Sequence, residues 1–579
     1  MNRATVLWLG ALVLLLVFLA LEPLGTFPIF GSDTGEYYRL TADLVTTGHL
    51  PLTSYPGWGY GYQDFPGIYV VAAGVAGAAG TDPLTALQVA VPVLAVLSAV
   101  PLFLLFRRLV PNDLVALLGA GLSTVAMPRM FSLAHPAPLA LGDLFVVAAL
   151  WMFVEGRRDA RWYFPLVLTG TALIVTHHLS TYFFLVTALG SLLVLELAFP
   201  GRWSRRFPTR ELAVVGALAV LALSYWLVYA QAFKEHVLGA PFDALSPAAT
   251  AVLVAAPVPL VLLIGLLLRW RRARALRRPR AGPGPRLPTD RAVVRDFAII
   301  GGGVAAGATV LLVVPLPGTG QVTAPGGILW FVPLILMIAG AAGSRRLVFF
   351  NRLGPFTLTW VAAVGISALV ALGTSDAVIS PARHAEYLLL PLGLLAALAL
   401  GRMVARWGDV GGRRATAAGA TALVLLLAAN AAIVYPPPAD FGGFQEGLTN
   451  ADAAMWLWAG VGLPAGAVVA SDHRLSSMVF GFDGDPATWG STPRLFTGWP
   501  SDWPAVASEL NGSFAPHGAL RPIDAVMVDG VMYGGVALDP SQLAQPLSPA
   551  ALAWLSGAPF VPIYESGPQV VYWVDGPVS

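Results

Sequence analysis

The feature that most restricts the fold of this chain is a long succession of apolar segments, each about as long as a membrane span. The 579 residues are 56% hydrophobic and only 11% charged, with a mean hydropathy of +0.71. Lipid rather than water must therefore surround most of the chain. We predict thirteen spans, at 5–24, 86–106, 113–128, 137–155, 162–177, 179–199, 211–231, 248–268, 296–315, 327–343, 355–373, 387–402 and 415–435.

The first apolar segment also has the pattern of a secretory signal. Val6–Ala20 holds no charge and follows Arg3. No small-x-small cleavage site is evident after it, and many comparable segments follow. An uncleaved first span is therefore the prediction.

The arginines give these spans an orientation, because positive residues gather in cytoplasmic loops. They occupy alternate loops, at 107–108, 157–161, 202–206, 269–291, 345–346 and 402–414. This alternation predicts a multi-pass protein of a prokaryotic plasma membrane, with its N-terminus in the cytoplasm. The predicted division is a transmembrane domain at 1–435, with a first outer loop at 25–85 and a basic cytoplasmic loop at 269–296, and an extracytoplasmic domain at 436–579.

Two assignments keep the arginine loops on one side. The apolar run at 162–199 is too long for one helix, so a hairpin turn is predicted at His177 and His178. The apolar stretch at 65–80 is short and rich in Gly and Ala, and we predict a helix along the membrane surface.

The segment after residue 436 has a different composition, with Pro, Gly and aromatic residues. Short β-like runs occur at 465–470, 525–528 and 559–574, and Ala451–Gly462 has a helical pattern. A small α/β domain is predicted.

Composition also excludes some chemistry. The chain has no cysteine, which rules out disulfides, thiol catalysis and cysteine metal sites. The basic stretch at 269–291 could contact nucleic acid, but a cytoplasmic loop near lipid headgroups is favoured, so membrane lipids and no nucleic acid are the predicted partners.

A candidate site begins directly after the first span, in GSDTGEYYRLTADLVTTGHLP. Asp33 and Glu36 lie there at the membrane boundary, ahead of an amphipathic helix. One interpretation is a helix cap, in which Ser32 or Asp33 accepts bonds from free backbone N–H groups. The other is an acid held at the surface as a general base or metal ligand. The two are compatible.

Further polar residues fall in later outer segments. Arg129 and His135 are the basic residues of a short predicted loop, and Asp143 lies inside the next span, where it requires a polar partner or a water-filled cavity. The segment at 374–391 contains Asp376, Arg383, His384 and Glu386. A guanidinium there could bind a phosphate, or Arg383 could pair with Glu386 on one helix face. All eight histidines fall on the outer side in this topology.

The order of these features resembles the GT-C superfamily of membrane glycosyltransferases, and most closely the single-subunit oligosaccharyltransferases of archaea and bacteria. The resemblance rests on GSDTGEYYRLTADLVTTGHL, which is similar to the first acidic motif of that family. Where the family has a second D-x-D motif, this chain has LAHPAPL, with His135 in place of the paired aspartates. Where the family has WWDYG, this chain has VVASDHRLSSMVFGFDG.

The resemblance implies transfer of a sugar or oligosaccharide from a polyprenyl-phosphate or polyprenyl-diphosphate donor to an acceptor on the outer face. It implies Asp33 and Glu36 as catalytic acids, and Arg383 and Arg129 as ligands of the donor phosphate. A divalent metal, Mg or Mn, would be held by Asp33, His135 and Glu386. The residues that would shape the site are His177, His178, His384 and Tyr37.

Two other classes of function remain at this point. A transporter or flippase of lipid-linked or polar substrates would require charges deep in several spans, and Asp143 is nearly alone there. A non-catalytic membrane scaffold would leave these polar residues without a shared site.

Overall fold

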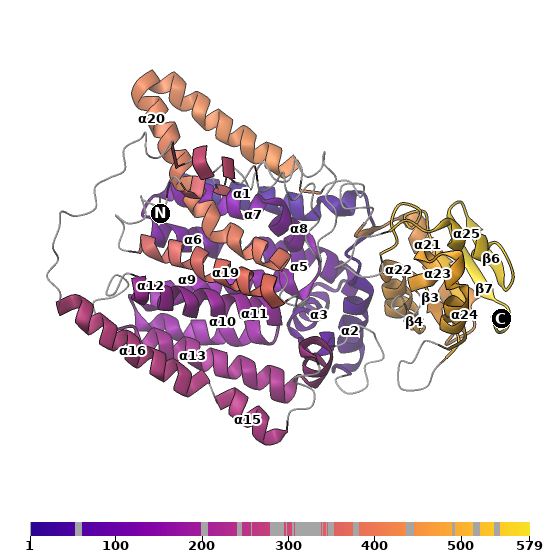
Figure 1. Ribbon diagram of the computed structural model, residues 1–579. Coiled ribbons are helices and arrows are strands. Elements are labelled where there is room, and N and C mark those ends of the chain that lie inside the picture. Colours follow the sequence, from indigo (N-terminus) through magenta and orange to yellow (C-terminus); the bar gives the residue numbers. More distant parts are fainter. Residues whose placement is uncertain are drawn as a thin grey trace.

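The computed structural model shows a helical part joined to a smaller part that contains a β-sheet (Figure 1). It describes residues 2–51, 61–198, 207–239, 246–255, 257–277, 295–296, 298–300, 302–303, 306, 337–338, 340–342, 344, 353–374, 381–432, 434–435, 445–488, 493–512, 521–537 and 545–578. Most of the predicted span at 296–315, most of that at 327–343, most of the basic loop, and Asp376 lie outside these residues.

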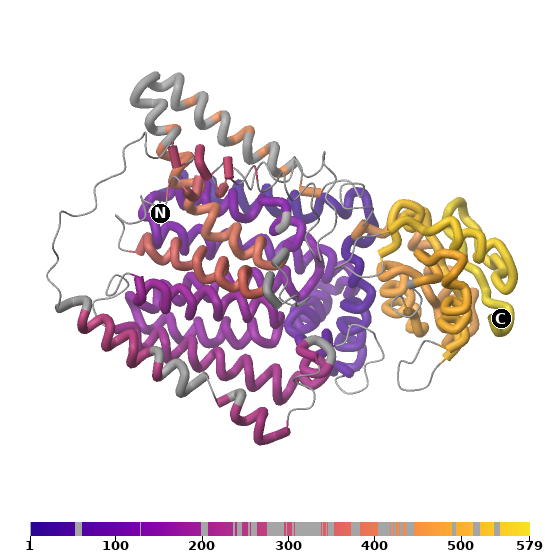
Figure 2. Tube along the Cα trace, in the orientation of Figure 1, coloured from indigo at the N-terminus to yellow at the C-terminus, as the bar shows by residue number. Residues whose placement is uncertain are grey.

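The helical part is built from long apolar helices packed side by side (Figure 2). Its α-helices are α1 (Arg3–Leu21), α2 (Thr34–Thr47), α3 (Gly67–Ala79), α4 (Pro83–Thr85), α5 (Val91–Val96), α6 (Ala99–Leu109), α7 (Asp113–Val125), α8 (Met127–Ala134), α9 (Pro138–Gly156), α10 (Tyr163–Ile174), α11 (His178–Leu185), α12 (Ser191–Ala198), α13 (Thr209–Ser224), α15 (Pro247–Ala255), α16 (Pro257–Arg277), α19 (Gly354–Thr374) and α20 (Pro381–Ala432).

Seven helical stretches among the described residues are long and apolar enough to cross a membrane. They are Arg3–Gly25, Pro83–Leu109, Pro138–Gly156, His178–Ala198, Thr209–Tyr229, Gly354–Ala371 and Arg383–Arg402. Each coincides with a predicted span. The count of thirteen stays a prediction, because several of the other spans are short helices or lie outside the described residues.

The helix break predicted at His177 is present, and the stretch at 65–80 forms the short helix α3. Its place along the membrane surface stays a prediction. Helix α10 ends at Ile174 and α11 begins at His178, whose N-cap His177 accepts a hydrogen bond from the Ser180 amide. Helix α3 has 13 residues. At 1.5 Å per residue it reaches about 20 Å, which is too short for a perpendicular crossing.

Two sequence predictions are wrong. The predicted outer loop at 129–136 is mostly helix α8, because Ala126 leaves the helical region at ψ 134° and Pro128 starts a new helix in its first turn. The predicted loop from Arg402 to Arg414 is helical too, inside α20. Its Arg, Met and Ala residues favour a helix, and its glycines do not interrupt the helix that runs from the span at 387–402 into that at 415–435.

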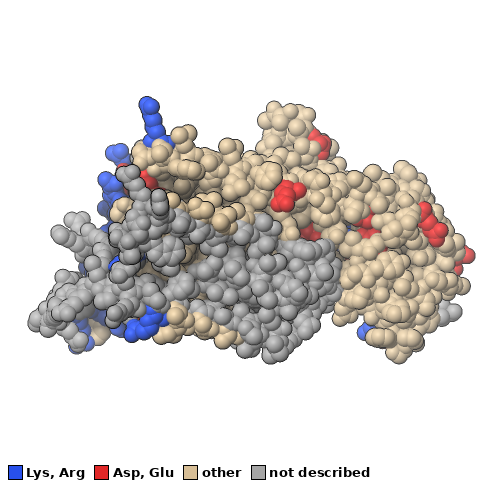
Figure 3. Space-filling view, turned by 90° about the horizontal axis from the view of Figure 1, so that it is seen from above, with Lys and Arg blue, Asp and Glu red and all other residues tan. Residues whose placement is uncertain are grey.

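The arginine-bearing ends of the helices meet one another. Arg107 bonds Asp113 at 2.6 Å, and Arg108 lies 3.3 Å from Glu155. Arg272 similarly lies 3.4 Å from Glu196. In the space-filling view, the visible Lys and Arg side chains gather mainly at the end away from the C-terminal sheet, and Asp and Glu lie mainly toward that sheet (Figure 3).

The C-terminal part contains a mixed five-stranded sheet in the order β4-β3-β5-β7-β6. Strand β3 runs parallel to β4 and β5, whereas β7 runs antiparallel to β5 and β6. The elements are α21 (Asn450–Gly462), β3 (Val469–Ala470), α22 (His473–Met478), β4 (Ala487–Thr488), α23 (Pro493–Thr497), α24 (Trp503–Gly512), β5 (Ala525–Val528), α25 (Pro549–Leu555), β6 (Phe560–Ser566) and β7 (Gln569–Val574). The predicted strands and the helix at 451–462 are present.

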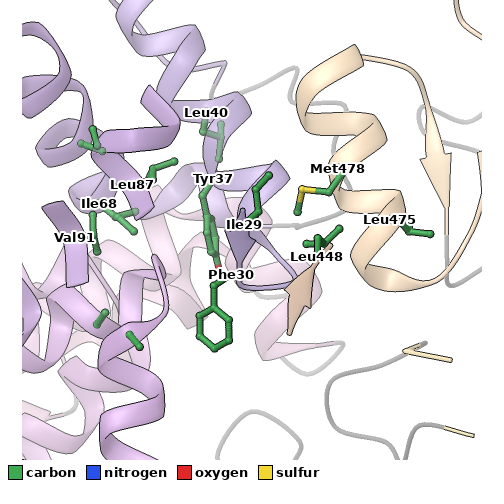
Figure 4. Close-up of a cluster of buried hydrophobic side chains, with 14 of the residues drawn as sticks. Ile29, Phe30, Tyr37, Leu40, Ile68, Leu87, Val91, Leu448, Leu475 and Met478 are labelled. Carbon is green, nitrogen blue, oxygen red and sulfur yellow. The ribbon is translucent and has the colours of Figure 1, made fainter. Parts of the chain in front are cut away.

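The two parts share one hydrophobic cluster (Figure 4). Ile29, Phe30 and Tyr37, from the segment that follows α1, pack with Leu448 and Met478 from the C-terminal part. A short antiparallel pairing of β1 (Ile29–Phe30) with β2 (Gly447–Leu448) lies at the same place. Burial of this shared apolar surface holds the C-terminal part against the loop that carries Asp33.

Candidate functional site

Asp33 stands at the junction between β1 and α2, in the N-cap position of the helix. Its side chain makes no capping hydrogen bond. The cap interpretation is therefore wrong for this carboxylate, whose oxygens accept hydrogen bonds from other side chains. The side chain is 23% exposed, which leaves the acid open to solvent or substrate.

Three side chains from separate segments donate to this carboxylate. His473 Nε2 lies 2.7 Å from Oδ1. The hydroxyls of Tyr37 and Tyr62 lie 3.3 and 3.2 Å from Oδ2. Tyr37 reaches it because residues four apart share a helix face. Burial, followed by the Asp33 charge, raises the pKa of both tyrosines well above its usual value, so both hydroxyls remain donors.

The His473 ring is nearly buried, and burial alone would disfavour its charge. The Asp33 carboxylate and the hydrogen bond to it outweigh that effect and raise the pKa of His473. This histidine is the first residue of α22, whose N-cap is Asp472. The Arg474 guanidinium bonds Asp472 and, at 2.9 Å, Asp529 in a fully buried group. These bonds fix the start of α22 and hence the His473 ring.

A second pair lies next to Asp33. His135 Nε2 is 3.3 Å from Glu446, whose Oε2 also accepts the Ser32 amide at 2.8 Å. Burial alone would raise the pKa of Glu446, but His135 and the Ser32 hydrogen bonds hold it at about 2. Burial opposes the charge of His135, and Glu446 nevertheless raises its pKa. The pair therefore joins α8 to the segment before β2.

Close backbone packing sets the distance between α2 and the segment formed by α22 and the helical turn after it, Val479–Asp483. A Cβ on Gly35 would lie 1.9 Å from the Ser477 carbonyl oxygen, and a Cβ on Gly481 would lie 2.2 Å from the Gly35 oxygen. Only glycine fits at these two positions. Their contact brings the N-terminus of α22 to Asp33.

A second polar group lies deeper, among the spans. Arg129 and Asp143 form an ion pair at 3.0 Å with both side chains fully buried. Asp143 thus has the polar partner that its depth requires. On the same helix as Arg129, Ser132 donates to Glu386 at 2.8 Å. Helix α8 therefore leads from this buried group, through Ser132, to His135 beside Asp33.

The other predicted site residues lie in several places around these two groups. Arg383 is exposed at the start of α20 and lies close enough to His177, His178 and Glu386 to interact with them electrostatically. His177 contacts Ser180 at 2.8 Å. The remaining two predicted site residues, His384 and Glu36, are buried. His384 Nε2 lies 2.8 Å from Ser367 Oγ, and the Glu36 amide lies 3.3 Å from Ser477 Oγ.

The sequence patterns did not identify three of the residues around Asp33, namely Tyr62, Glu446 and His473. Tyr62 belongs to the stretch SYPGWGYGYQDFPG, whose aromatic residues could equally anchor the chain at the membrane interface. His473 carried one signal, its place among the histidines that the predicted topology puts on the outer side. Glu446 carried none.

The residues present do not fit a divalent cation in this arrangement. Of the three predicted ligands, Asp33 bonds His473, His135 pairs with Glu446, and Glu386 accepts a hydrogen bond from Ser132 in the other group. Within the described ranges no three His, Asp or Glu side chains are grouped so that they could hold a metal ion. The metal role predicted for Asp33, His135 and Glu386 therefore lacks support in this geometry.

The fold resembles that of solved oligosaccharyltransferases. The oligosaccharyltransferase of Archaeoglobus fulgidus in the apo form matches with a TM-score of 0.62 at 16% identity, over 91% of this chain and 70% of that one. The same enzyme, AglB, with an inhibitory peptide and a dolichol-phosphate matches with a TM-score of 0.60 at 15% identity, over 91% and 69%. Its complex with zinc and sulfate matches with a TM-score of 0.58 at 16% identity, over 90% and 67%.

These matches confirm the resemblance at the level of the fold. No protein-family model matches the sequence, and no curated protein matches it.

Proposed function

We propose that this protein is a membrane glycosyltransferase that moves a sugar or oligosaccharide from a polyprenyl-phosphate or polyprenyl-diphosphate donor to an acceptor at the non-cytoplasmic face. The observation that carries the proposal is the Asp33 carboxylate. It is partly exposed, is not used as a helix cap, and is oriented by three donors from three segments. A structural acid would be expected at a cap or inside a buried ion pair.

The fold supports the class of reaction. In the archaeal enzyme with the same fold, a dolichol-phosphate has been seen bound. A polyprenyl carrier for the present chain follows from that likeness as part of the proposal. The arginine alternation supports an orientation with the C-terminal part outside the cytoplasm.

In the proposed reaction, an acceptor hydroxyl or amide nitrogen attacks the anomeric carbon of the donor sugar. A bond forms between the acceptor and that carbon, and the bond from carbon to the phosphate oxygen breaks. Asp33 accepts the proton of the acceptor, and the polyprenyl phosphate or diphosphate leaves. His473, Tyr37 and Tyr62 hold the carboxylate in one orientation for this transfer.

Arg383 is proposed to neutralise the leaving phosphate. Its exposed guanidinium stands near the N-terminus of α20, where the helix dipole adds a partial positive charge. A planar guanidinium can donate two parallel hydrogen bonds to phosphate oxygens. Arg129 is a weaker candidate for this role, because Asp143 already balances its charge.

The test replaces Asp33 by Asn in the full-length protein. Cells with and without the protein are extracted, and their lipid-linked sugars are compared by mass spectrometry. We expect the variant to insert and express normally but to transfer no sugar, so that the polyprenyl-linked donor accumulates as it does without the protein. Asp43→Asn is the matched control, since Asp43 lies on the same helix and only pairs with Arg39 at the surface. Normal turnover by the Asp33 variant would refute the assignment.

A further inference from the structure

Gln88 is a buried polar side chain near the start of Pro83–Leu109, a helical stretch long and apolar enough to cross a membrane. Only 5% of it is exposed. A polar side chain in such a place is costly unless its groups find hydrogen-bond partners. The partners of Gln88 all belong to one segment, Phe30–Thr34, which carries Asp33.

The side-chain amide of Gln88 pairs with Phe30 as the backbone of a neighbouring strand would. The Phe30 amide donates to Gln88 Oε1 at 3.1 Å, and Gln88 Nε2 donates to the Phe30 carbonyl at 3.0 Å. A carboxamide has the same donor and acceptor as a peptide group, so it satisfies both backbone groups at once. Nε2 also donates to Thr34 Oγ1 at 3.2 Å. Gln88 therefore holds the chain both before and after Asp33.

The residues between Phe30 and Asp33 are held from the opposite side by Glu446. The Gly31 amide donates to the Glu446 carbonyl at 3.2 Å, and the Ser32 amide donates to Glu446 Oε2 at 2.8 Å. The backbone that leads into Asp33 is thus fixed by one residue of a candidate span and by one residue of the C-terminal part. Its position sets where the Asp33 carboxylate lies.

The local sequence explains why Gln88 occupies this place. Pro92 has no N–H to donate to the Gln88 carbonyl four residues back, and its ring crowds that carbonyl. The helix widens here, because Ala86–Ala90 is a π-helical turn that is closed by the Val91 amide on a carbonyl five residues back. Leu87 and Val91, near Gln88 on the same turn, pack into the shared hydrophobic cluster (Figure 4). Packing therefore fixes the turn from which the Gln88 amide extends.

We propose that Gln88 is a positioning residue for sugar transfer, which holds the segment Phe30–Thr34 so that the Asp33 carboxylate stands where it can take the proton of the acceptor. The proposal rests on the proposed function, because it treats Asp33 as the general base. Gln88 acts through the backbone and takes no part in the bond changes. Since a displacement of a reacting group by about 1 Å can slow a reaction about 100-fold, loss of these bonds should slow transfer without weakening donor binding.

The first measurement is amide hydrogen exchange of the purified full-length protein in detergent, followed by mass spectrometry in the peptides that cover Phe27–Tyr37. Gln88→Met keeps an unbranched side chain of similar size but removes the amide. We expect exchange at Phe30 to become about tenfold faster or more, because its hydrogen-bond partner is gone. Thr5→Val is the matched control, since Thr5 is also buried and bonds Asp113 at 2.9 Å from the other end of α1. It should leave this exchange unchanged.

The second measurement is the rate of transfer at increasing amounts of added donor. The donor is the polyprenyl-linked sugar that accumulates in cells without the protein, and membranes of those cells supply the acceptor. We expect Gln88→Met to lower kcat about 10- to 100-fold and to change the KM for the donor by less than about twofold. Thr5→Val should change neither constant. A merely structural role of Gln88 would reduce the amount of folded protein but not the kcat of the protein that remains folded.

Three results would overturn the proposal. Unchanged exchange in Gln88→Met would mean that the amide does not hold the segment, whatever the transfer assay gives. Faster exchange with unchanged kcat would mean that Asp33 needs no such support. A raised KM with unchanged kcat would place Gln88 in donor binding instead.

The proposed function fails by a different result, normal transfer in Asp33→Asn, and the exchange measurement does not depend on it. If Gln88→Met does not fold, judged by its thermal unfolding, Gln88→Asn replaces it in both measurements. Its side chain is one methylene shorter, so its amide cannot keep the same bonds to both backbone groups of Phe30.

Discussion

Two aspartates show how differently this molecule uses a carboxylate. Asp33 is 23% exposed and accepts from His473, Tyr37 and Tyr62, which come from three separate segments. Asp143 is fully buried among the spans and faces one cation, Arg129, at 3.0 Å. An acid with several weak, separately replaceable donors can exchange partners during a reaction. An acid buried beside one guanidinium is a fixed part of the fold, because losing that partner would leave a charge without water.

The largest effect that this comparison predicts comes from breaking the buried pair. Arg129→Leu removes the counter-charge of Asp143 and should destabilise the protein by about 3–5 kcal/mol. The change should appear as a large fall in the thermal unfolding temperature in detergent, or as loss of folded protein. Asp33→Asn, in contrast, should leave the unfolding temperature nearly unchanged.

The double variant Arg129→Leu with Asp143→Leu sharpens this prediction. Replacing both charges by apolar side chains should restore most of the lost stability, because no uncompensated charge remains. Equal damage in the single and double variants would show that packing, not charge balance, dominates here. Unchanged stability with weakened binding of a polyprenyl phosphate would instead favour the phosphate role predicted for Arg129.

The next effect concerns the contact that brings His473 to Asp33. In Gly35→Ala the new Cβ would meet the Ser477 carbonyl oxygen at 1.9 Å, so α2 and α22 must separate. Such overpacking costs about 1–3 kcal/mol. We expect faster amide hydrogen exchange in α22 and weaker transfer. Gly74→Ala, on helix α3 with no atom within 4 Å of the new Cβ, should cause neither change. Identical exchange in both variants would contradict this account.

The sequence predicted the spans and part of the site for a definite physical reason. A span is encoded by a contiguous apolar stretch, so each of the seven candidate spans coincides with a predicted one. Asp33 and Tyr37 are likewise local, four residues apart on one helix. His473 and Tyr62 are 440 and 29 residues from Asp33 along the chain. Their approach depends on tertiary packing, including the contact at Gly35, which no local pattern records.

The prediction at 129–136 failed for a related reason. Polar residues and two prolines are typical of a loop, yet Pro128 is accommodated in the first turn of α8. The helix then turns Arg129 and Ser132 toward partners on α9 and α20. The hydropathy pattern located the polar residues, and only the packed helices show that they are paired.

A smaller effect is expected from the pH dependence of the ion pair beside Asp33, formed by His135 and Glu446. The folded pKa of Glu446 is about 2, below its ordinary value of 4.5, so its contribution is present above pH 4.5 and is lost as the pH falls toward 2. The folded pKa of His135 is raised, so its contribution is full below its ordinary value of 6.5 and is lost as the pH rises through the raised value. The pair should stabilise most between these limits.

Glu446→Gln tests this window, because the amide can still accept the Ser32 hydrogen bond but carries no charge. Thermal unfolding of both proteins is followed across pH. The difference between them should be on the order of 1 kcal/mol near pH 5–6 and should shrink at both extremes. Asp33 also faces His135 and would broaden the upper limit. A difference that does not vary with pH would show that the pair is not ionised.

The smallest effect is expected from the tyrosines, and it distinguishes an acid with replaceable donors from one held in a buried ion pair. Tyr37→Phe and Tyr62→Phe each remove one hydrogen bond to Asp33 Oδ2, at 3.3 and 3.2 Å. Each should cost about 1 kcal/mol or less and slow transfer modestly, since the other hydroxyl still holds that oxygen. The double variant should lose more than the sum of the singles, because Oδ2 then has neither donor. Additive losses, measured by unfolding and by transfer rate, would mean that the two hydroxyls act independently and do not share the task of orienting the carboxylate.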